Sequence, residues 1–213
     1  MLQARLCASA AELVAGLQRL SPRPQVLLID MPIGMPERGS RRCDQLARQR
    51  LGVRRSSIFP APIRPVLQAD SWEEACAIRE RIEGKRMSQQ SWNITAKVRE
   101  VDALLQAEPA LRGWLREGHP ELSFSLLAGA PLPATKKTAT GKTLRQKLVA
   151  AQFGADAYAA VREQFRRSQV ADDDILDAFA ALWSAERLLR SEAITLPIDP
   201  ELDATGLTME ITA

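Results

Sequence analysis

A run of four apolar residues, 26–29, ends at Asp30 and limits what this chain can fold into. The run does not alternate with polar residues, which is typical of a strand buried on both faces, as in a parallel sheet. Residues 3–8 predict a short strand and residues 9–20 predict a helix, so the order strand, helix, strand favours an α/β fold. Asp30 would then end a central strand, at the edge where open α/β sheets bind ligands.

Helical patterns account for much of the remaining chain. Ser9 and Ser71 each precede a glutamate by three residues, which is the spacing of a capping box. Several helices fall between the first strands and the later ones. We therefore expect one domain, 1–213, with a helical insertion at about 60–112. Further helices are predicted at 40–51 (opened by Ser40), 71–83, 88–105, 141–152, 155–167 and 172–190, and strands at 57–59, 194–197 and 206–212.

Composition excludes several kinds of site. His119 is the one histidine, which rules out sites that need two or three histidines. The three cysteines are widely spaced and form no CxxC pair, so a disulfide framework or a structural zinc site is not expected. Any catalytic metal would be held by carboxylates, which favours Mg²⁺ or Mn²⁺. The chain lacks a run of roughly 18 apolar residues. We accordingly expect no membrane contact and a cytoplasmic location.

Four aspartates fall in the sequence ADDDILDA, residues 171–178. Asp177 follows Asp173 by four positions and Asp174 by three, so a helix would bring these side chains to one face. A helix start explains part of this cluster, because acids are stabilised there and Asp172 can act as the N-cap. It explains Asp177 poorly, since that residue lies deeper among apolar neighbours. A divalent cation would turn the carboxylate repulsion into attraction, so both interpretations stay open.

Asp30 and the segment His119-Pro120-Glu121 are the other candidates. Asp30 could serve a ligand at the strand end, or it could cap the following turn. Pro120 fixes the backbone between two polar side chains. Glu121 could bind metal and His119 could transfer a proton or contact phosphate, while the alternative is a purely structural turn.

Basic residues gather in two stretches, although the formal net charge is only +3. They could contact a phosphate backbone or form two solvated faces. The sequence Gly-Lys-Thr at 141–143 is not a phosphate-binding P-loop, because Lys136 stands where the upstream glycine is needed. The candidates for phosphate contact are Arg41, Arg42, Arg54, Arg55, Lys136, Lys137 and Lys142.

Eight motifs in their order along the chain resemble one family, the predicted RNase H-like nucleases known as domain of unknown function 429. The motifs are LLIDMPIGMP, RxCDxxAR, RSSIFPAPIRPVL, SxQxWNIxxKVxEVD, GHPELSF, TKKTxxGxxxR, DDxLDAxxAxWxA and DxxGLxMEI. The resemblance implies an RNase H-like fold, in which helices flank a mixed five-stranded sheet. It also implies that Asp30, Glu121, Asp173 and Asp177 hold divalent metal at the edge of the sheet.

The chain departs from this resemblance at its start. RNase H-like sheets begin with a hairpin whose first strand carries an aspartate, and nothing like it precedes Asp30. We expect about 30 to 40 residues, the length of two strands with turns, to be missing. The alternative is that this protein has lost part of its site. An unpaired strand edge would invite pairing with another chain, so a homodimer through that edge is a further expectation.

The predicted function is metal-dependent hydrolysis of phosphodiester bonds in nucleic acid by two Mg²⁺ or Mn²⁺ ions, impaired by the missing strands. Two alternatives stay open: a non-catalytic module that binds nucleic acid or a protein, and an enzyme acting on a phosphorylated small molecule. The predicted catalytic residues are Asp30, His119, Glu121, Asp173 and Asp177, and the predicted metal ligands are Asp30, Glu121, Asp173, Asp174 and Asp177.

Overall fold

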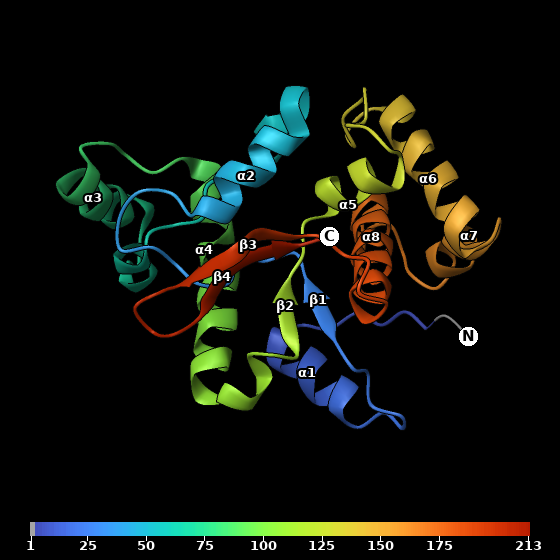
Figure 1. The fold of residues 1–213 in the computed structure, drawn as a ribbon, viewed down its shortest axis with the longest axis horizontal. Coiled ribbons are helices and arrows are strands. Elements are labelled where there is room, and N and C mark those ends of the chain that lie inside the picture. Colours follow the sequence, from blue (N-terminus) through green and yellow to red (C-terminus); the bar gives the residue numbers. More distant parts are fainter. Residues whose placement is uncertain (1–2) are drawn as a thin grey trace.

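The computed structural model describes residues 3–213 and has the predicted α/β architecture. Short strands lie in the middle of the molecule and helices surround them (Figure 1). The helices are α1 (Ala10–Gln18), α2 (Arg42–Leu51), α3 (Trp72–Glu83), α4 (Gln89–Ala107), α5 (Pro120–Leu127), α6 (Ala139–Phe153), α7 (Ala157–Arg162) and α8 (Asp172–Leu189). The strands are β1 (Leu27–Ile29), β2 (Leu115–Glu117), β3 (Thr195–Leu202) and β4 (Thr208–Thr212), and the 3₁₀ helices are η1 (Gly52–Ser57), η2 (Arg64–Gln68) and η3 (Pro109–Leu111).

The strands form two short pairs. β1 and β2 are parallel, with Leu27 opposite Leu115, and β3 and β4 form an antiparallel hairpin. A single parallel bridge between Gly118 and Thr212 joins the two pairs. The mixture of parallel and antiparallel strands agrees with the expected mixed sheet. Across residues 3–213, however, the strands form these two pairs rather than one five-stranded sheet.

Several local predictions are confirmed by the caps of the helices. The hydroxyl of Ser9 accepts a hydrogen bond from the backbone amide of Glu12 at 3.0 Å, and that of Ser71 accepts one from Glu74 at 3.1 Å. β1 ends at Ile29, so Asp30 immediately follows a strand of a parallel pair, as predicted. These features depend on short-range sequence patterns, and for that reason the sequence alone is enough to find them.

Three local predictions are wrong. Residues 3–8 form no strand, and Ala4 instead packs against the hydrophobic cluster of α5, α6, α7 and α8. Residues 57–59 form no strand either, because η1 runs into them and three prolines without amide donors follow closely. Helix α2 is not opened by Ser40; it begins at Arg42, after an extended residue whose side chain turns into the protein.

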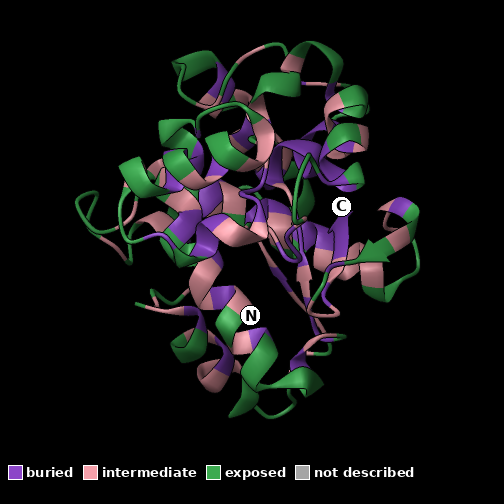
Figure 2. Cartoon of the chain, turned by 90° about the vertical axis from the view of Figure 1, so that its left-hand side faces the viewer, coloured by how far each residue is buried: buried purple, intermediate pink, exposed green. Residues whose placement is uncertain are grey.

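The hydrophobic core is divided into several clusters, and the two largest belong to different groups of elements. Helices α5, α6, α7 and α8 bury one cluster, which includes Phe124, Val149 and Phe179. Helices α1 and α4 bury another against β1 and β2, which includes Val101 and Leu115. Figure 2 shows that buried residues concentrate inside the molecule while exposed residues cover the outer faces of the helices. None of the helices described here is long and apolar enough to cross a membrane.

The segment predicted as an insertion contains η2, α3, α4 and η3. Ile63, Val66, Cys76 and Met87 form a small core of their own between η2 and α3. In Figure 1, α3 lies on the opposite side of the molecule from α6 and α7. Helix α4 also packs against α1, so it connects this segment with the strands.

A buried group of charged residues connects α2 with the end of β2. Arg41 Nη1 lies 2.6 Å from Glu117 Oε2, and Arg41 Nη2 lies 2.5 Å from Asp44 Oδ1. Glu117 Oε2 also accepts a hydrogen bond from the amide of Ile33 at 2.7 Å, and Asp44 Oδ2 accepts one from Ala61 at 3.2 Å. The three charged side chains are at most 4% exposed. They therefore hold the loop after β1, the start of α2 and the end of β2 together.

Burial and charge act in opposite directions within this group. Burial raises the pKa of Glu117, and the nearby Arg41 guanidinium opposes that rise. Burial lowers the pKa of Arg41, but Glu117 and Asp44 outweigh it, so the pKa of Arg41 lies well above its ordinary value. The arginine is therefore charged at any physiological pH, and its charge is balanced only by its two buried partners.

Substitution of Arg41 by methionine tests how strongly the fold depends on this group. Arg41→Met leaves two carboxylates buried without a counter-charge, and we expect the free energy of unfolding to fall by about 3–5 kcal/mol. Urea unfolding followed by circular dichroism measures the change. Arg42→Met is the matched control, because Arg42 is exposed on the same helix and its replacement should leave the stability nearly unchanged. Equal stability losses in the two variants would contradict the assignment.

Candidate active site

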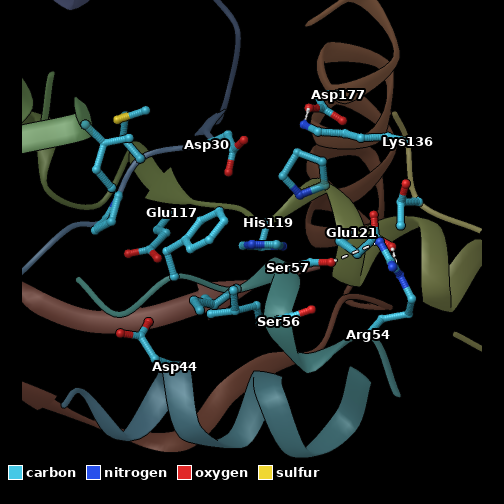
Figure 3. Close-up of a pocket in the computed structure, with 18 of the residues that line it drawn as sticks. Asp30, Asp44, Arg54, Ser56, Ser57, Glu117, His119, Glu121, Lys136 and Asp177 are labelled. Atoms are coloured by element: carbon cyan, nitrogen blue, oxygen red, sulfur yellow. Dashed lines mark hydrogen bonds and ion pairs between the residues drawn. The ribbon is translucent and has the colours of Figure 1, made fainter. Parts of the chain in front are cut away.

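A cavity of about 440 Å³ lies where β1 and β2 end. Its walls come from the segment after β1, from η1, from the β2–α5 junction, from the loop before α6 and from α8. Figure 3 shows His119 in the middle of this space, with Asp30 and Asp177 on one side and Ser56 and Ser57 on the other. The titratable side chains that line it are Asp30, Arg41, Asp44, Arg54, Glu117, His119, Glu121, Lys136, Lys137 and Asp177.

Asp30 reaches the cavity because β1 stops immediately before it. The residue is open to the solvent of the cavity while protein surrounds it on the other sides. This partial desolvation raises the pKa of Asp30, and the nearby His119 and Lys136 oppose the rise. A carboxylate in such surroundings favours a cation or a proton as its partner.

Asp177 lies one turn into α8 and forms an ion pair with Lys136. The distance from Lys136 Nζ to Asp177 Oδ2 is 2.5 Å, and the Asp177 side chain is 14% exposed. Burial raises the pKa of Asp177 to about 6; Lys136 lowers it, while Asp30 and Asp173 raise it. Burial also lowers the pKa of Lys136, but Asp177, Asp30 and Asp173 outweigh this effect and raise it. Lys136 therefore lies among three carboxylates.

The other aspartates of α8 do not line the cavity. Lys137 Nζ lies 2.7 Å from Asp173 Oδ2, and Lys142 forms an ion pair with Asp172. Asp174 is exposed, and its carboxylate accepts a hydrogen bond at 3.0 Å from the backbone amide that precedes the helix. Asp172 and Asp174 thus fit the helix-start interpretation, with Ala171 rather than Asp172 at the N-cap position.

Glu121 lines the cavity but is held by two arginines. Arg145 Nη2 lies 2.6 Å from one carboxylate oxygen of Glu121, and Arg54 Nε lies 3.2 Å from the other. Arg145 is 0% exposed and belongs to α6. Both oxygens of Glu121 therefore already have cationic partners, and the residue ties α5 to α6 and η1.

His119 immediately precedes α5 and lines the cavity. Its carbonyl oxygen accepts hydrogen bonds from the amides of Leu122 and Ser123, both at 3.0 Å, so the main chain at His119 is anchored by the first turn of the helix. Its Nδ1 is buried and has no hydrogen-bond partner among the described residues. The main chain at His119 is therefore anchored, while the Nδ1 atom of the ring is free to meet a ligand of the cavity.

The four arginines predicted to contact phosphate differ in their surroundings. The predicted phosphate contact of Arg41 is wrong, because its side chain is only 1% exposed and its donors are directed at buried acids. Arg54 is partly buried and pairs with Glu121. Arg42 and Arg55 are exposed on the outer faces of α2 and η1. Of the four arginines, only these last two are therefore exposed to solvent.

A metal centre of four carboxylates is not assembled. No group of three or more histidine, cysteine, aspartate or glutamate side chains within residues 3–213 is arranged to hold a metal ion. Asp30 and Asp177 nevertheless act on the same ammonium, that of Lys136, and the charge of Asp30 is felt at Asp177. Carboxylate oxygens are the ligands that Mg²⁺ and Mn²⁺ prefer. Two of the predicted ligands therefore fit a cation, whereas Glu121 and Asp173 are directed at other side chains.

Sequence patterns missed three residues that shape the cavity: Asp44, Glu117 and Arg145. Asp44 and Arg145 belong to the motifs RxCDxxAR and TKKTxxGxxxR, which could have drawn attention to them. Glu117 ends β2 as Asp30 follows β1, but the strand is only three residues long and carries no clear pattern. Because each of the three is paired and buried, their role is to position the site.

The loop before α6 is fixed by a close backbone approach. Thr138 caps α6 by accepting a hydrogen bond from the amide of Gly141 at 3.0 Å, and its own hydroxyl donates to the carbonyl of Thr135 at 3.0 Å. A Cβ atom on Gly141 would collide with that same carbonyl of Thr135. Glycine is required here because the loop that carries Lys136 and Lys137 lies directly on the helix.

Gly141→Ala should displace this loop. We expect the variant to lose about 1–3 kcal/mol of stability, the typical cost of overpacking. Thermal unfolding measures the loss, and Thr140→Ala is the matched control because Thr140 is exposed in the same turn. An alanine at position 141 that is as stable as the control would show that the loop adapts without strain.

The pKa of Asp177 predicts a change of stability with pH. The folded value of about 6 lies above the ordinary 3.8, so the folded state binds this proton more tightly. The contribution of Asp177 to stability is therefore highest at acid pH, falls as the pH rises from about 4 to about 6, and is constant above that range. The fall corresponds to about 3 kcal/mol at most.

Urea unfolding of wild type and Asp177→Asn between pH 4 and pH 7 measures this contribution. We expect the stability of the wild type to fall with pH relative to that of the variant, because asparagine does not titrate. Asp174→Asn, which alters an exposed acid of the same helix, should follow the wild-type profile. Parallel profiles for wild type and Asp177→Asn would mean that Asp177 titrates normally.

The comparisons with known proteins confirm the family to which the sequence motifs point, domain of unknown function 429, and say nothing of its activity. The family model described as "Protein of unknown function (DUF429)" matches residues 2–202. No curated protein and no solved structure gives a significant match. Because the match covers nearly the whole chain, this protein belongs to the DUF429 family.

Proposed function

We propose that the cavity hydrolyses phosphodiester bonds of a nucleic acid, DNA or RNA, with Mg²⁺ or Mn²⁺ held by Asp30 and Asp177. One observation carries the proposal: Asp30, His119 and Asp177 come from distant parts of the chain and line the same cavity where the parallel strands end. Ligands of α/β sheets bind at this edge. A histidine beside two carboxylates is also suited to proton transfer and cation binding.

The reaction needs a nucleophile, a charge-neutralising group and a proton carrier. A divalent cation bound by the two aspartates would lower the pKa of water and neutralise charge on the phosphate. The water oxygen forms a bond to phosphorus while the bond from phosphorus to the leaving oxygen breaks. His119 can take the proton of the attacking water or give one to the leaving oxygen, because its ring lines the cavity.

The substrate backbone would lie along the wall made by η1. Arg54, Ser56 and Ser57 line that side of the cavity, and Arg55 is exposed on the same 3₁₀ helix. Arginine and serine side chains contact phosphate without reading the base sequence. We therefore expect binding that depends on salt and little on sequence.

A second candidate is an enzyme that acts on a phosphorylated small molecule. The observation that favours it is the cavity volume of about 440 Å³, because pockets of about 300–1,000 Å³ suit small ligands. The two candidates share the reaction at phosphorus and differ in what the outer surface must bind.

The proposal is tested by cleavage assays on single- and double-stranded DNA and RNA with Mn²⁺. We expect Asp30→Asn to reduce cleavage to background, and His119→Ala to reduce it by about 100-fold or more. Asp174→Asn is the matched control, since Asp174 is an acid outside the cavity lining. It should cleave at the wild-type rate.

Each other outcome has a separate meaning. Cleavage that persists in Asp30→Asn would place the chemistry elsewhere. Absence of cleavage, together with hydrolysis of a small phosphodiester such as bis(p-nitrophenyl) phosphate, would favour the small-molecule candidate. Salt-sensitive nucleic-acid binding without any hydrolysis would favour a non-catalytic binding module.

A further inference from the structure

The ammonium of Lys136 lies where a cation would satisfy the cavity carboxylates. Its Nζ is 2.5 Å from Asp177 Oδ2 and 4.0 Å from Asp173 Oδ2. In Figure 3 the lysine approaches Asp177 from the loop, and Asp30 lies across from the pair. A side chain on the loop before α6 therefore neutralises acids that come from α8 and from the end of β1.

The backbone of the loop before α6 holds Lys136 in this position. Arg145 donates hydrogen bonds to the carbonyls of Ala134 and Gly141, at 3.2 and 2.9 Å. Together with the contact of Gly141 on the loop, these bonds fix the backbone on both sides of Lys136. The side chain of Lys136 is 36% exposed, so it is not enclosed by protein and has space to turn away from the acids.

Two further lysines, one in the same loop and one in the first turn of α6, form ion pairs with α8. Lys137 pairs with Asp173 at 2.7 Å, and Lys142 pairs with Asp172. Lys136 differs from both of them because it and its partner Asp177 are the pair that lines the cavity together. Of the three ion pairs, the Lys136 pair is therefore the one in direct competition with a ligand of the cavity.

We propose that Lys136 is an exchangeable counter-ion: it neutralises Asp177 in the metal-free protein, and it turns to the phosphate of the substrate when a divalent cation takes its place. This inference rests on the proposed function. The exchange conserves charge balance, because the cation brings positive charge to the aspartates while the phosphate receives the ammonium. It couples metal binding to substrate binding, since each of them favours the same position of Lys136.

The proposal predicts that Lys136 weakens metal binding. If the released position of the lysine is populated at about a tenth or less, its removal tightens the apparent affinity by about 10-fold or more. We expect Lys136→Met to bind Mn²⁺ at least about 10-fold more tightly than wild type, measured by electron paramagnetic resonance of free Mn²⁺. Lys136→Arg, which keeps the charge, should remain close to wild type.

The matched control is Lys142→Met, which removes the same charge from the same lysine group but contacts Asp172 outside the cavity lining. It should bind Mn²⁺ as the wild type does. Equal tightening in Lys136→Met and Lys142→Met would reduce the effect to general electrostatics and overturn the proposal. Unchanged affinity in Lys136→Met, in a variant with a normal melting curve, would overturn it as well.

A measurement on the unaltered protein completes the test. Mn²⁺ should speed amide hydrogen exchange in residues 134–138, because the loop loses its ion pair when Lys136 is displaced. Exchange that slows or stays constant at saturating Mn²⁺ would show that the lysine does not leave. Nuclease activity is assayed separately. If the protein cleaves but Lys136→Met binds Mn²⁺ no more tightly than wild type, only the exchange of Lys136 is contradicted. If no variant binds Mn²⁺, the proposed function is contradicted as well.

Discussion

The buried ion pair between Arg41 and Glu117 is the interaction on which the arrangement of the cavity depends. Arg41 stands before α2 and Glu117 ends β2, and both are almost without exposed surface. The cost of burying these charges is offset because Asp44 and the amide of Ile33 complete the hydrogen bonds. The ion pair therefore favours one relative position of α2, the strands and the loop that starts at Asp30. A core of apolar side chains alone would tolerate small shifts of these elements.

Cationic partners divide the acidic residues of this protein into two kinds. Glu117 and Glu121 are each held by a buried arginine. The guanidinium of Arg41 binds both carboxylate oxygens of Glu117, whereas Arg145 and Arg54 each bind one oxygen of Glu121. Asp177 is held by a lysine, a single ammonium on a flexible stem that reaches it from the open side of the cavity. Arginine pairs thus build the walls, whereas the lysine pair can exchange its partner.

The cluster of aspartates at the start of α8 combines a structural and a chemical part. Asp172 and Asp174 stabilise the first turn of α8: Asp172 pairs with basic side chains, and Asp174 accepts a hydrogen bond from a backbone amide. The start of the helix therefore explains both residues without a ligand. Asp177 lies on the side of the helix that faces the strands and the cavity. Sequence spacing could put Asp173, Asp174 and Asp177 on one face of a helix, but it could not distinguish the solvent side from the cavity side.

The sequence by itself determined the α/β class, most helix positions, the caps at Ser9 and Ser71, and Asp30 at the end of a parallel strand. These features follow from periodicity and capping, which act over a few residues. Only the tertiary structure decided which charged groups are paired. Arg41 meets Glu117 across 76 positions, Lys136 meets Asp177 across 41 and Arg145 meets Glu121 across 24. A charge at the surface and a charge in a buried pair look alike in a sequence, because the difference lies in the distance to a partner that the packing of helices and strands brings near.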